Sequence, residues 1–348
     1  MNRVLRVLVV DDSAYVRKVI SQMLTRSPYI EVVGIARDGE EALEKVEELN
    51  PDVVTLDLIM PNMDGVEFLR KQMPRRRVPV IIVSIASESG ELVLEALNAG
   101  AVDFVQKPSA LATEKIFEIS DELISKVKAL AEVPPSRLAT PDFRELKSPP
   151  SVITAPGSRN VDIVVLGIST GGPQGLTFLI PQLPADLPVP VAVVLHMPVG
   201  YTELFARRLN ERSALKVIEA KEGDLVSPGV VLVAPAGRHM TFRRQADGTT
   251  LTHLDVRPLD TLHRPSVDVL FESAAQVFGD RVLGVVMTGM GSDGKQGAAW
   301  IKSHGGTIFT EAEDTCVVYG MPRSVDEAGL SDKSVPLTHM AQAIMEGI

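Results

Sequence analysis

Short runs of β-branched apolar residues alternate with amphipathic segments twice along this chain, and this alternation restricts its fold more than any other feature. In the first series the expected strands cover 3–10, 31–35, 53–56, 80–84 and 103–106. The expected helices cover 11–24 with its cap, 39–49, 65–73, 91–99 and 113–131. Strict alternation predicts an α/β domain with a five-stranded, doubly wound parallel sheet of order 2-1-3-4-5.

The second series begins at Val161. Expected strands cover 161–167, 189–196, 230–234 and 280–287, and expected helices cover 174–180 and 202–212. Between them, the turn signal Asp247-Gly248 separates two short strand-like runs and predicts a hairpin. We therefore expect a second doubly wound, Rossmann-like domain whose mostly parallel sheet has an antiparallel excursion.

A proline-rich segment separates the two series. Residues 131–160 contain six of the 24 prolines and have no sustained apolar periodicity. Proline interrupts helices, and a polar segment has little to bury, so this stretch predicts an extended linker. The predicted organisation is a first domain over 1–130, a linker over 131–160 and a second domain over 161–348.

Composition excludes several classes of protein. The net charge of −10 disfavours nucleic acid and anionic membrane as partners, because both are negatively charged. A single cysteine, Cys316, excludes an internal disulfide framework and a cysteine-based zinc cluster. No apolar run approaches ~18 residues, and the N-terminus lacks a signal peptide, so we expect a cytoplasmic protein without membrane insertion.

Carboxylates follow two strands of the first series. Asp11 and Asp12 end the first strand and Asp57 ends the third, and these strand ends adjoin at the switch point of the predicted sheet. Three clustered carboxylates repel one another unless a cation lies among them, and oxygen ligands in an open site favour Mg²⁺.

A hydroxyl and an ammonium complete this cluster. Ser84 ends the fourth strand and Lys107 ends the fifth. The lysine and the metal would neutralise a phosphoryl group, the serine would donate a hydrogen bond to it, and Asp57 would accept it. The alternative is that these polar residues only cap loops.

The first turn of the second domain contains Ser169 in Gly167-Ile168-Ser169-Thr170-Gly171-Gly172. Glycines at this position suit either a dinucleotide site or an exposed serine nucleophile. His196 follows the next strand, so parallel strands deliver both residues to one rim, where the imidazole can take the serine proton.

Asp293 lies in a third glycine-rich loop, after the strand 280–287. There it would fix the imidazole tautomer, and the backbone N–H of Met290 in the same loop would face an oxyanion. The order Ser–His–Asp differs from that of α/β-hydrolases. The remaining histidines, His263 among them, have no comparable placement, and metal binding is disfavoured because no histidine or cysteine pair has ligand spacing.

The stretches VLVVDDS, VTLDLIMPNMDG and FVQKP resemble the response-regulator receiver domain over about residues 3–128. This resemblance implies that Asp57 is the phosphorylation site and that Asp11 and Asp12 hold Mg²⁺ with it. It also implies that Lys107 contacts the phosphoryl group. Ser84 and Phe104 would be the switch pair.

The stretches GISTGGP, LHMP, VAPAGRHM, LHRPSVDVLFES, VMTGMGSDGKQGA and VYGMPR resemble the catalytic domain of the CheB chemotaxis methylesterases over about residues 160–345. This resemblance implies hydrolysis of glutamate γ-methyl esters on chemoreceptor cytoplasmic domains, releasing methanol. Ser169, His196 and Asp293 would be the catalytic triad, with Met290 at the oxyanion site and no cofactor for the ester reaction.

The same family resemblance implies regulation and a second reaction. The histidine kinase CheA would phosphorylate Asp57 and thereby relieve inhibition of the esterase by the receiver. Some members of the family also deamidate receptor glutamines. The alternative function is a response regulator whose second domain only binds a nucleotide or a partner. A DNA-binding output is disfavoured by the acidic charge and by the absence of a helix-turn-helix signal.

Overall fold

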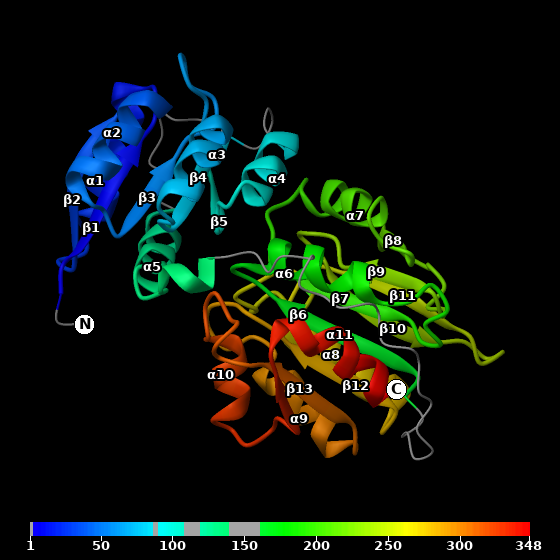
Figure 1. Ribbon diagram of the computed structural model, residues 1–348. Helices are drawn as coiled ribbons and strands as arrows, with labels where there is room; N and C mark the ends of the chain where they lie inside the picture. Colours follow the sequence, from blue (N-terminus) through cyan, green and yellow to red (C-terminus); the bar gives the residue numbers. More distant parts are fainter. Residues whose placement is uncertain (1–2, 86–89, 108–118, 139–160) are drawn as a thin grey trace. The chain divides into compact units, whose positions relative to one another are not determined.

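Each of the two series of strands forms a parallel sheet of its own (Figure 1). The structure, a computed structural model, describes residues 3–85, 90–107, 119–138 and 161–348. The chain divides into two units, Met1–Thr140 and Pro141–Ile348. No helix in the described residues is both long and apolar enough to cross a membrane.

The first unit is a five-stranded sheet of order β2-β1-β3-β4-β5, which confirms the predicted doubly wound arrangement. Its strands are β1 (Leu5–Val10), β2 (Ile30–Ala36), β3 (Val53–Leu56), β4 (Val80–Ile85) and β5 (Asp103–Lys107). Its helices are α1 (Ala14–Leu24), α2 (Gly39–Leu49), α3 (Gly65–Arg75), α4 (Gly90–Asn98) and α5 (Ser120–Leu130), followed by the 3₁₀ turn η2 (Pro135–Leu138).

Burial and capping explain these elements. All four residues of β3 are buried, as expected for a central strand covered on both faces. Ser13, Asp38 and Asp64 cap α1, α2 and α3 by accepting the backbone N–H of the residue three positions later. These caps start each helix soon after a strand, so the polar strand-end residues lie in short, fixed loops.

The second unit has a seven-stranded parallel sheet of order β14-β13-β12-β6-β7-β9-β8. Its strands are β6 (Ile163–Ile168), β7 (Val191–Leu195), β8 (Lys216–Glu219), β9 (Val230–Val233), β12 (Val282–Val286), β13 (Thr307–Glu311) and β14 (Lys333–Val335). Its helical segments are α6 (Gly172–Leu179), η4 (Ile180–Gln182), α7 (Thr202–Asn210), α8 (Val267–Phe278), α9 (Lys295–Ser303), α10 (Met321–Asp326) and α11 (Leu337–Gly347).

The predicted antiparallel hairpin is present. It consists of β10 (His239–Arg244) and β11 (Thr250–Asp255), with Gly248 in the turn at φ +88°. The two strands form a separate two-stranded sheet. All strand pairs in the seven-stranded sheet are parallel, so the predicted Rossmann-like domain with an antiparallel hairpin is confirmed.

Other boundaries differ from the expectation or lie beyond what the structure describes. The short strands β8, β13 and β14 were not expected, and they occupy the sides of the sheet. The helix expected over 113–131 is described from Ser120 to Leu130, and its predicted start lies outside the described residues. Most of the predicted linker, 131–160, also lies outside them, apart from the segment that contains η2.

The core of the second unit lies between the sheet and α8. Apolar side chains of β6, β7 and β12 pack with Val267, Leu270 and Phe271 of that helix. A Cβ at Gly167 would lie 2.2 Å from Val267 Cγ1, so the glycine at the end of β6 lets α8 approach the strand. This packing fixes the start of α8 close to the carboxyl ends of the three central strands.

Candidate active site and acidic cluster

Strand register makes Ser169 and His196 neighbours. Ile168 of β6 pairs with Leu195 of β7, so the two residues that follow these strands occupy adjacent positions at the same edge of the sheet. The backbone N–H of His196 donates to Ile168 O at 3.2 Å, and the N–H of Ser169 donates to Thr288 O at 2.9 Å. Ser169 is thus held between the ends of β7 and β12.

Asp293 binds the imidazole of His196. His196 Nε2 lies 2.9 Å from Asp293 Oδ2. The carboxylate also accepts the Ser266 hydroxyl and the backbone N–H groups of Val267 and Asp268, each at 2.8 to 2.9 Å. Burial acts to raise the pKa of Asp293, but the bonds from His196 and the two N–H groups outweigh it and hold this pKa well below its ordinary value. Asp293 therefore stays ionised.

The other imidazole nitrogen is available for chemistry. His196 Nδ1 is buried and has no hydrogen-bond partner in the described part of the chain. Because Nε2 faces an ionised carboxylate, its proton sits there, and Nδ1 carries the lone pair. The structure forms no hydrogen bond between Ser169 Oγ and this nitrogen, although their backbones are adjacent. The nucleophile–base contact is the one link of the predicted triad that is not already made.

Glycines allow the third loop to approach the serine. A Cβ at Gly289 would lie 2.7 Å from Ser169 Cβ, so only glycine fits there. Met290 follows directly, and its backbone N–H takes part in none of the hydrogen bonds between described residues. Gly171, at φ +78°, caps α6 and turns the chain after Ser169. These features put a candidate oxyanion donor next to the turn that carries the nucleophile.

His263 lies against the candidate site, although its only mark in the sequence is the nearby proline of a loop. Its ring stacks on His196, with 4.1 Å between ring centroids and 24° between the planes. It lies in the loop between β11 and α8, where no strand end or glycine motif marks it. It does not follow a strand end as His196 does, and it reaches the site through ring stacking.

Asp268 is a second residue that sequence reasoning missed. Its Oδ1 accepts the backbone N–H groups of Gly294 and Gly297, at 2.9 and 2.7 Å, and so ties α8 to the start of α9. Burial and the neighbouring Asp293 raise its pKa to about 6 against these bonds. An aspartate in the first turn of a helix is common, so the sequence could not distinguish it.

The first unit brings its predicted residues together at the ends of β1, β3 and β5. Lys107 Nζ lies 2.6 Å from both Asp11 Oδ2 and Asp57 Oδ2, and all three side chains are nearly buried. Asp57 Oδ1 also accepts the N–H of Leu58 at 2.7 Å. Asp12 is exposed at the rim of this cluster.

The cluster has an excess of negative charge. Oxygen atoms of Asp11, Asp12 and Asp57 all lie within 4.8 Å of one another, with one lysine against three carboxylates. Burial raises the pKa of Asp11 to about 6, and Asp57 adds to this while Lys107 opposes it. A divalent cation would relieve this strain, so the donor set fits the magnesium site expected from the sequence.

Ser84 and Phe104 lie on the neighbouring strands β4 and β5. Both side chains are buried, with 4% exposed. Phe104 pairs with Ile82 and Ser84 with Gln106, so the two residues are two positions apart along the strand pair. The predicted switch residues therefore lie on adjacent strands, with Ser84 two positions nearer than Phe104 to the carboxyl ends of the strands.

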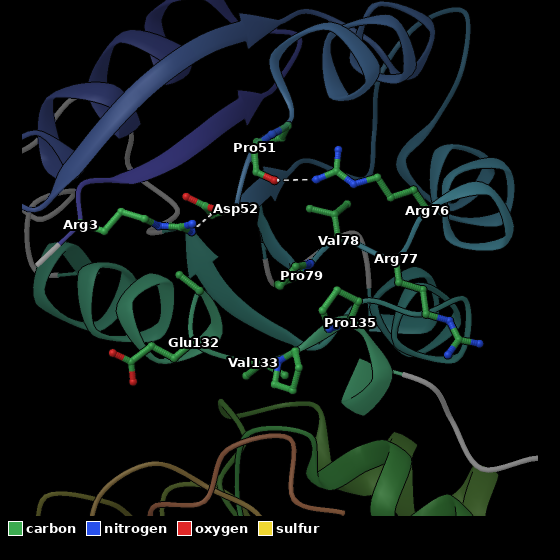
Figure 2. Close-up of a pocket in the computed structure, with 12 residues that line it drawn as sticks. Arg3, Pro51, Asp52, Arg76, Arg77, Val78, Pro79, Glu132, Val133 and Pro135 are labelled. Atoms are coloured by element: carbon green, nitrogen blue, oxygen red, sulfur yellow. Dashed lines mark hydrogen bonds and ion pairs between the residues drawn. The ribbon is translucent and has the colours of Figure 1, made fainter. Parts of the chain in front are cut away.

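A pocket of about 380 Å³ lies elsewhere on the first unit (Figure 2). It is lined by residues that precede β3 and β4 and by the end of α5, among them Asp52, Val78 and Val133. Figure 2 shows Arg3 turned to Asp52 and Arg76 turned to Pro51. This pocket is at the amino ends of the strands and contains none of the predicted site residues.

Comparison with known proteins gives two family matches and many full-length relatives. The family model for the CheB methylesterase matches residues 164–344, and that for the response regulator receiver domain matches 7–118. A Myxococcus xanthus protein named protein-glutamate methylesterase/protein-glutamine glutaminase 5 is 52% identical over 97% of this chain and 96% of its own length. A Thermotoga maritima protein of the same name, without the number, is 41% identical over 99% of both chains.

A solved structure agrees with these matches. The Thermotoga maritima CheB methylesterase catalytic domain superposes with a TM-score of 0.53 and 41% identity, covering 54% of this chain and 99% of that domain. The share of this chain that it covers equals that of residues 161–348, the described part of the second unit.

Proposed function

The chain belongs to the CheB methylesterase family, and from this premise we propose that it hydrolyses glutamate γ-methyl esters on chemoreceptors with Ser169 as the nucleophile. The observation that carries the catalytic assignment is the His196 imidazole, held at Nε2 by Asp293 and left with a buried, unpartnered Nδ1. An imidazole in this state can act as a general base, and the pairing of β6 with β7 puts Ser169 at the adjacent position of the same sheet edge.

The first half of the reaction acylates the serine. Ser169 Oγ attacks the ester carbonyl carbon while His196 Nδ1 takes its proton, and the ionised Asp293 stabilises the imidazolium. The carbonyl oxygen gains the negative charge and accepts the N–H of Met290. The C–O bond to the methoxy group then breaks, and the imidazolium gives its proton to the leaving oxygen. Methanol departs and a glutamyl–serine ester remains.

The second half restores the enzyme. Water attacks the acyl carbonyl while His196 accepts one of its protons, and the same proton returns to Ser169 Oγ as the acyl bond breaks. The product is a free glutamate side chain. The same reaction steps on a receptor glutamine would release ammonia in place of methanol. The relatives are named as both methylesterase and glutaminase, which supports this second activity.

The first unit is proposed to control this chemistry. Asp57 accepts a phosphoryl group from the kinase CheA, and Asp11, Asp12 and Asp57 would hold Mg²⁺, whose charge would neutralise the phosphoryl oxygens. Lys107 already contacts two of these carboxylates and adds a second positive charge. Phosphorylation then biases Ser84 and Phe104 and relieves inhibition of the esterase.

Methanol release from a methylated, soluble chemoreceptor fragment tests this function. The wild-type chain with acetyl phosphate and Mg²⁺ is expected to release methanol, and Ser169→Ala is expected to lose this by ~10⁴-fold or more, because the acyl-enzyme cannot form. Phosphorylation of Ser169→Ala by labelled acetyl phosphate should remain normal. Hydrolysis retained in this variant would reject Ser169 as the nucleophile.

Asp57→Ala is the matched variant for regulation. It keeps the catalytic loops and removes the phosphoryl acceptor, so its basal methanol release should equal that of the unphosphorylated wild type. Addition of acetyl phosphate should then have no effect. Activation that persists in Asp57→Ala would separate the phosphodonor effect from this residue.

A further inference from the structure

One buried acid in the second unit has no part in the proposed reaction. Glu311 is the last residue of β13, and its side chain is completely buried. Its Oε2 accepts the backbone N–H of Thr288 at 2.9 Å, and its Oε1 accepts the Thr315 hydroxyl at 3.1 Å. None of the salt bridges between described residues includes Glu311, so its carboxyl has no cationic partner to explain its burial.

Thr288 connects this carboxyl to the candidate active site. Its carbonyl accepts the N–H of Ser169 at 2.9 Å, and its hydroxyl donates to Thr170 O at 3.0 Å. It also directly precedes Gly289 and Met290. Glu311 holds the N–H of Thr288. Thr288 in turn sets the position of both the Ser169 turn and the candidate oxyanion loop.

The surroundings of Glu311 favour its neutral form. Burial raises the pKa of Glu311 to about 7, and Asp314 adds to this, while bonds from Thr288, Thr315 and Cys316 oppose it. The Thr315 hydroxyl has a second acceptor in Ala312 O, at 3.3 Å. The hydroxyl hydrogen can therefore turn to Ala312 O while Thr315 Oγ1 accepts a hydrogen bond from the protonated carboxyl, so the neutral side chain loses no hydrogen bond.

We propose that Glu311 is a positioning residue for the esterase, which as a neutral carboxyl fastens Thr288 and thereby holds the Ser169 turn and the Met290 loop in one arrangement. This inference rests on the proposed function for its kinetic consequences. Ionisation places an uncompensated charge in the core behind these loops, which loosens the arrangement and opposes the negative charge that develops on the substrate. The esterase should therefore lose activity through this group as the pH rises through neutrality.

Kinetics of the full-length chain with acetyl phosphate and the methylated receptor fragment test the role. Glu311→Ala leaves the Thr288 N–H without its acceptor, and kcat is expected to fall by ~10- to 100-fold while KM changes little. Val282→Ala is the control for lost stability, because it leaves a cavity at the start of β12, at the opposite end of the strand from Thr288, and it should keep the wild-type kcat. Equal kcat values for Glu311→Ala and wild type would overturn the proposal.

Glu311→Gln tests the ionisation separately. Its amide is always neutral, accepts from Thr288 and donates to Thr315, so it should keep the wild-type kcat at pH 6. The ratio of kcat for Glu311→Gln to kcat for wild type should rise between pH 6 and pH 8.5. A flat ratio over this range would show that Glu311 does not act as a neutral group.

Thermal unfolding gives a reading that does not depend on the enzymatic function. The pKa of Glu311 is about 7 in the folded chain and 4.5 ordinarily, so folding favours the protonated form. The stability that this gives is complete below pH 4.5 and is lost as the pH rises through 7. The Tm of Glu311→Gln should match wild type near pH 5 and exceed it at pH 8.5, and an unchanged difference would contradict the assignment.

Discussion

Gly289 lies between the Ser169 turn and the segment that begins α10. Its N–H donates to Val318 O, and its own carbonyl accepts the N–H groups of Gly320 and Met321. A Cβ there would lie 2.4 Å from Met321 Sδ and 2.7 Å from Ser169 Cβ. Real side chains do not tolerate such distances, so a substitution must push the Met290 loop away from the nucleophile.

Gly289→Ala is therefore expected to impair catalysis more than folding. Displacing the loop by about 1 Å should lower kcat for methanol release by ~100-fold, with the effect on KM small. Gly175→Ala in α6 is the control, since its Cβ would meet only the flexible ends of the Ile168 and Met287 side chains. Wild-type activity in Gly289→Ala would show that the loop has no part in the reaction.

For single residues, the sequence predicts the site residues that follow strand ends and misses the residues that pack against them or bond to them. Ser169, His196 and Asp293 each follow a recognisable strand in a polar or glycine-rich loop. His263, Asp268 and Glu311 act on them through packing and hydrogen bonds between segments far apart in the chain. Nothing local distinguishes a stacked histidine from an exposed one, so these partners required coordinates.

Among elements, long buried strands were predicted well and short edge strands were not. The β-branched runs of β1, β6 and β12 are buried on both faces of their sheets, and such apolar runs indicate strands clearly. β8 and β14 have only four and three residues and include exposed lysines, so no periodicity signals them. The helix starts of the first unit were clearer because Ser13, Asp38 and Asp64 are strong caps.

The cap of α3 gives a prediction for element stability. Asp64 Oδ1 accepts the N–H of Glu67 at 2.8 Å. Asp64→Ala should destabilise the first unit by about 1 kcal/mol, whereas Asp64→Ser, which can still cap, should cost much less. Hydrogen exchange of α3 peptides in the full-length chain, measured by mass spectrometry, should be faster in the alanine variant alone. Equal exchange in both would mean that the cap adds nothing.

For the whole molecule, the two units have separate sheets and separate chemistry. Asp57 and its partners lie within Met1–Thr140, and the predicted triad lies within Pro141–Ile348. This division was visible in the sequence because the two strand series carry different polar residues at their ends.

A shortened chain separates catalysis from control. Residues 161–348 contain Ser169, His196 and Asp293 without the phosphoryl acceptor, so the proposed inhibition cannot act on them. This fragment should release methanol from methylated receptor at least as fast as the unphosphorylated full chain, and acetyl phosphate should not change its rate. A rate well below that of the unphosphorylated full chain, from a fragment shown to be folded, would argue against inhibition by the first unit.

The strand order of the second unit has a consequence for how such proteins diverge. β12, β6 and β7, whose ends bear Asp293, Ser169 and His196, are the middle three of seven strands, with two strands on either side. Insertions, deletions and new surface patches at the outer strands leave the reacting groups in register. Changes confined to the two outer strands on each flank are therefore expected to preserve the relative positions of these three side chains.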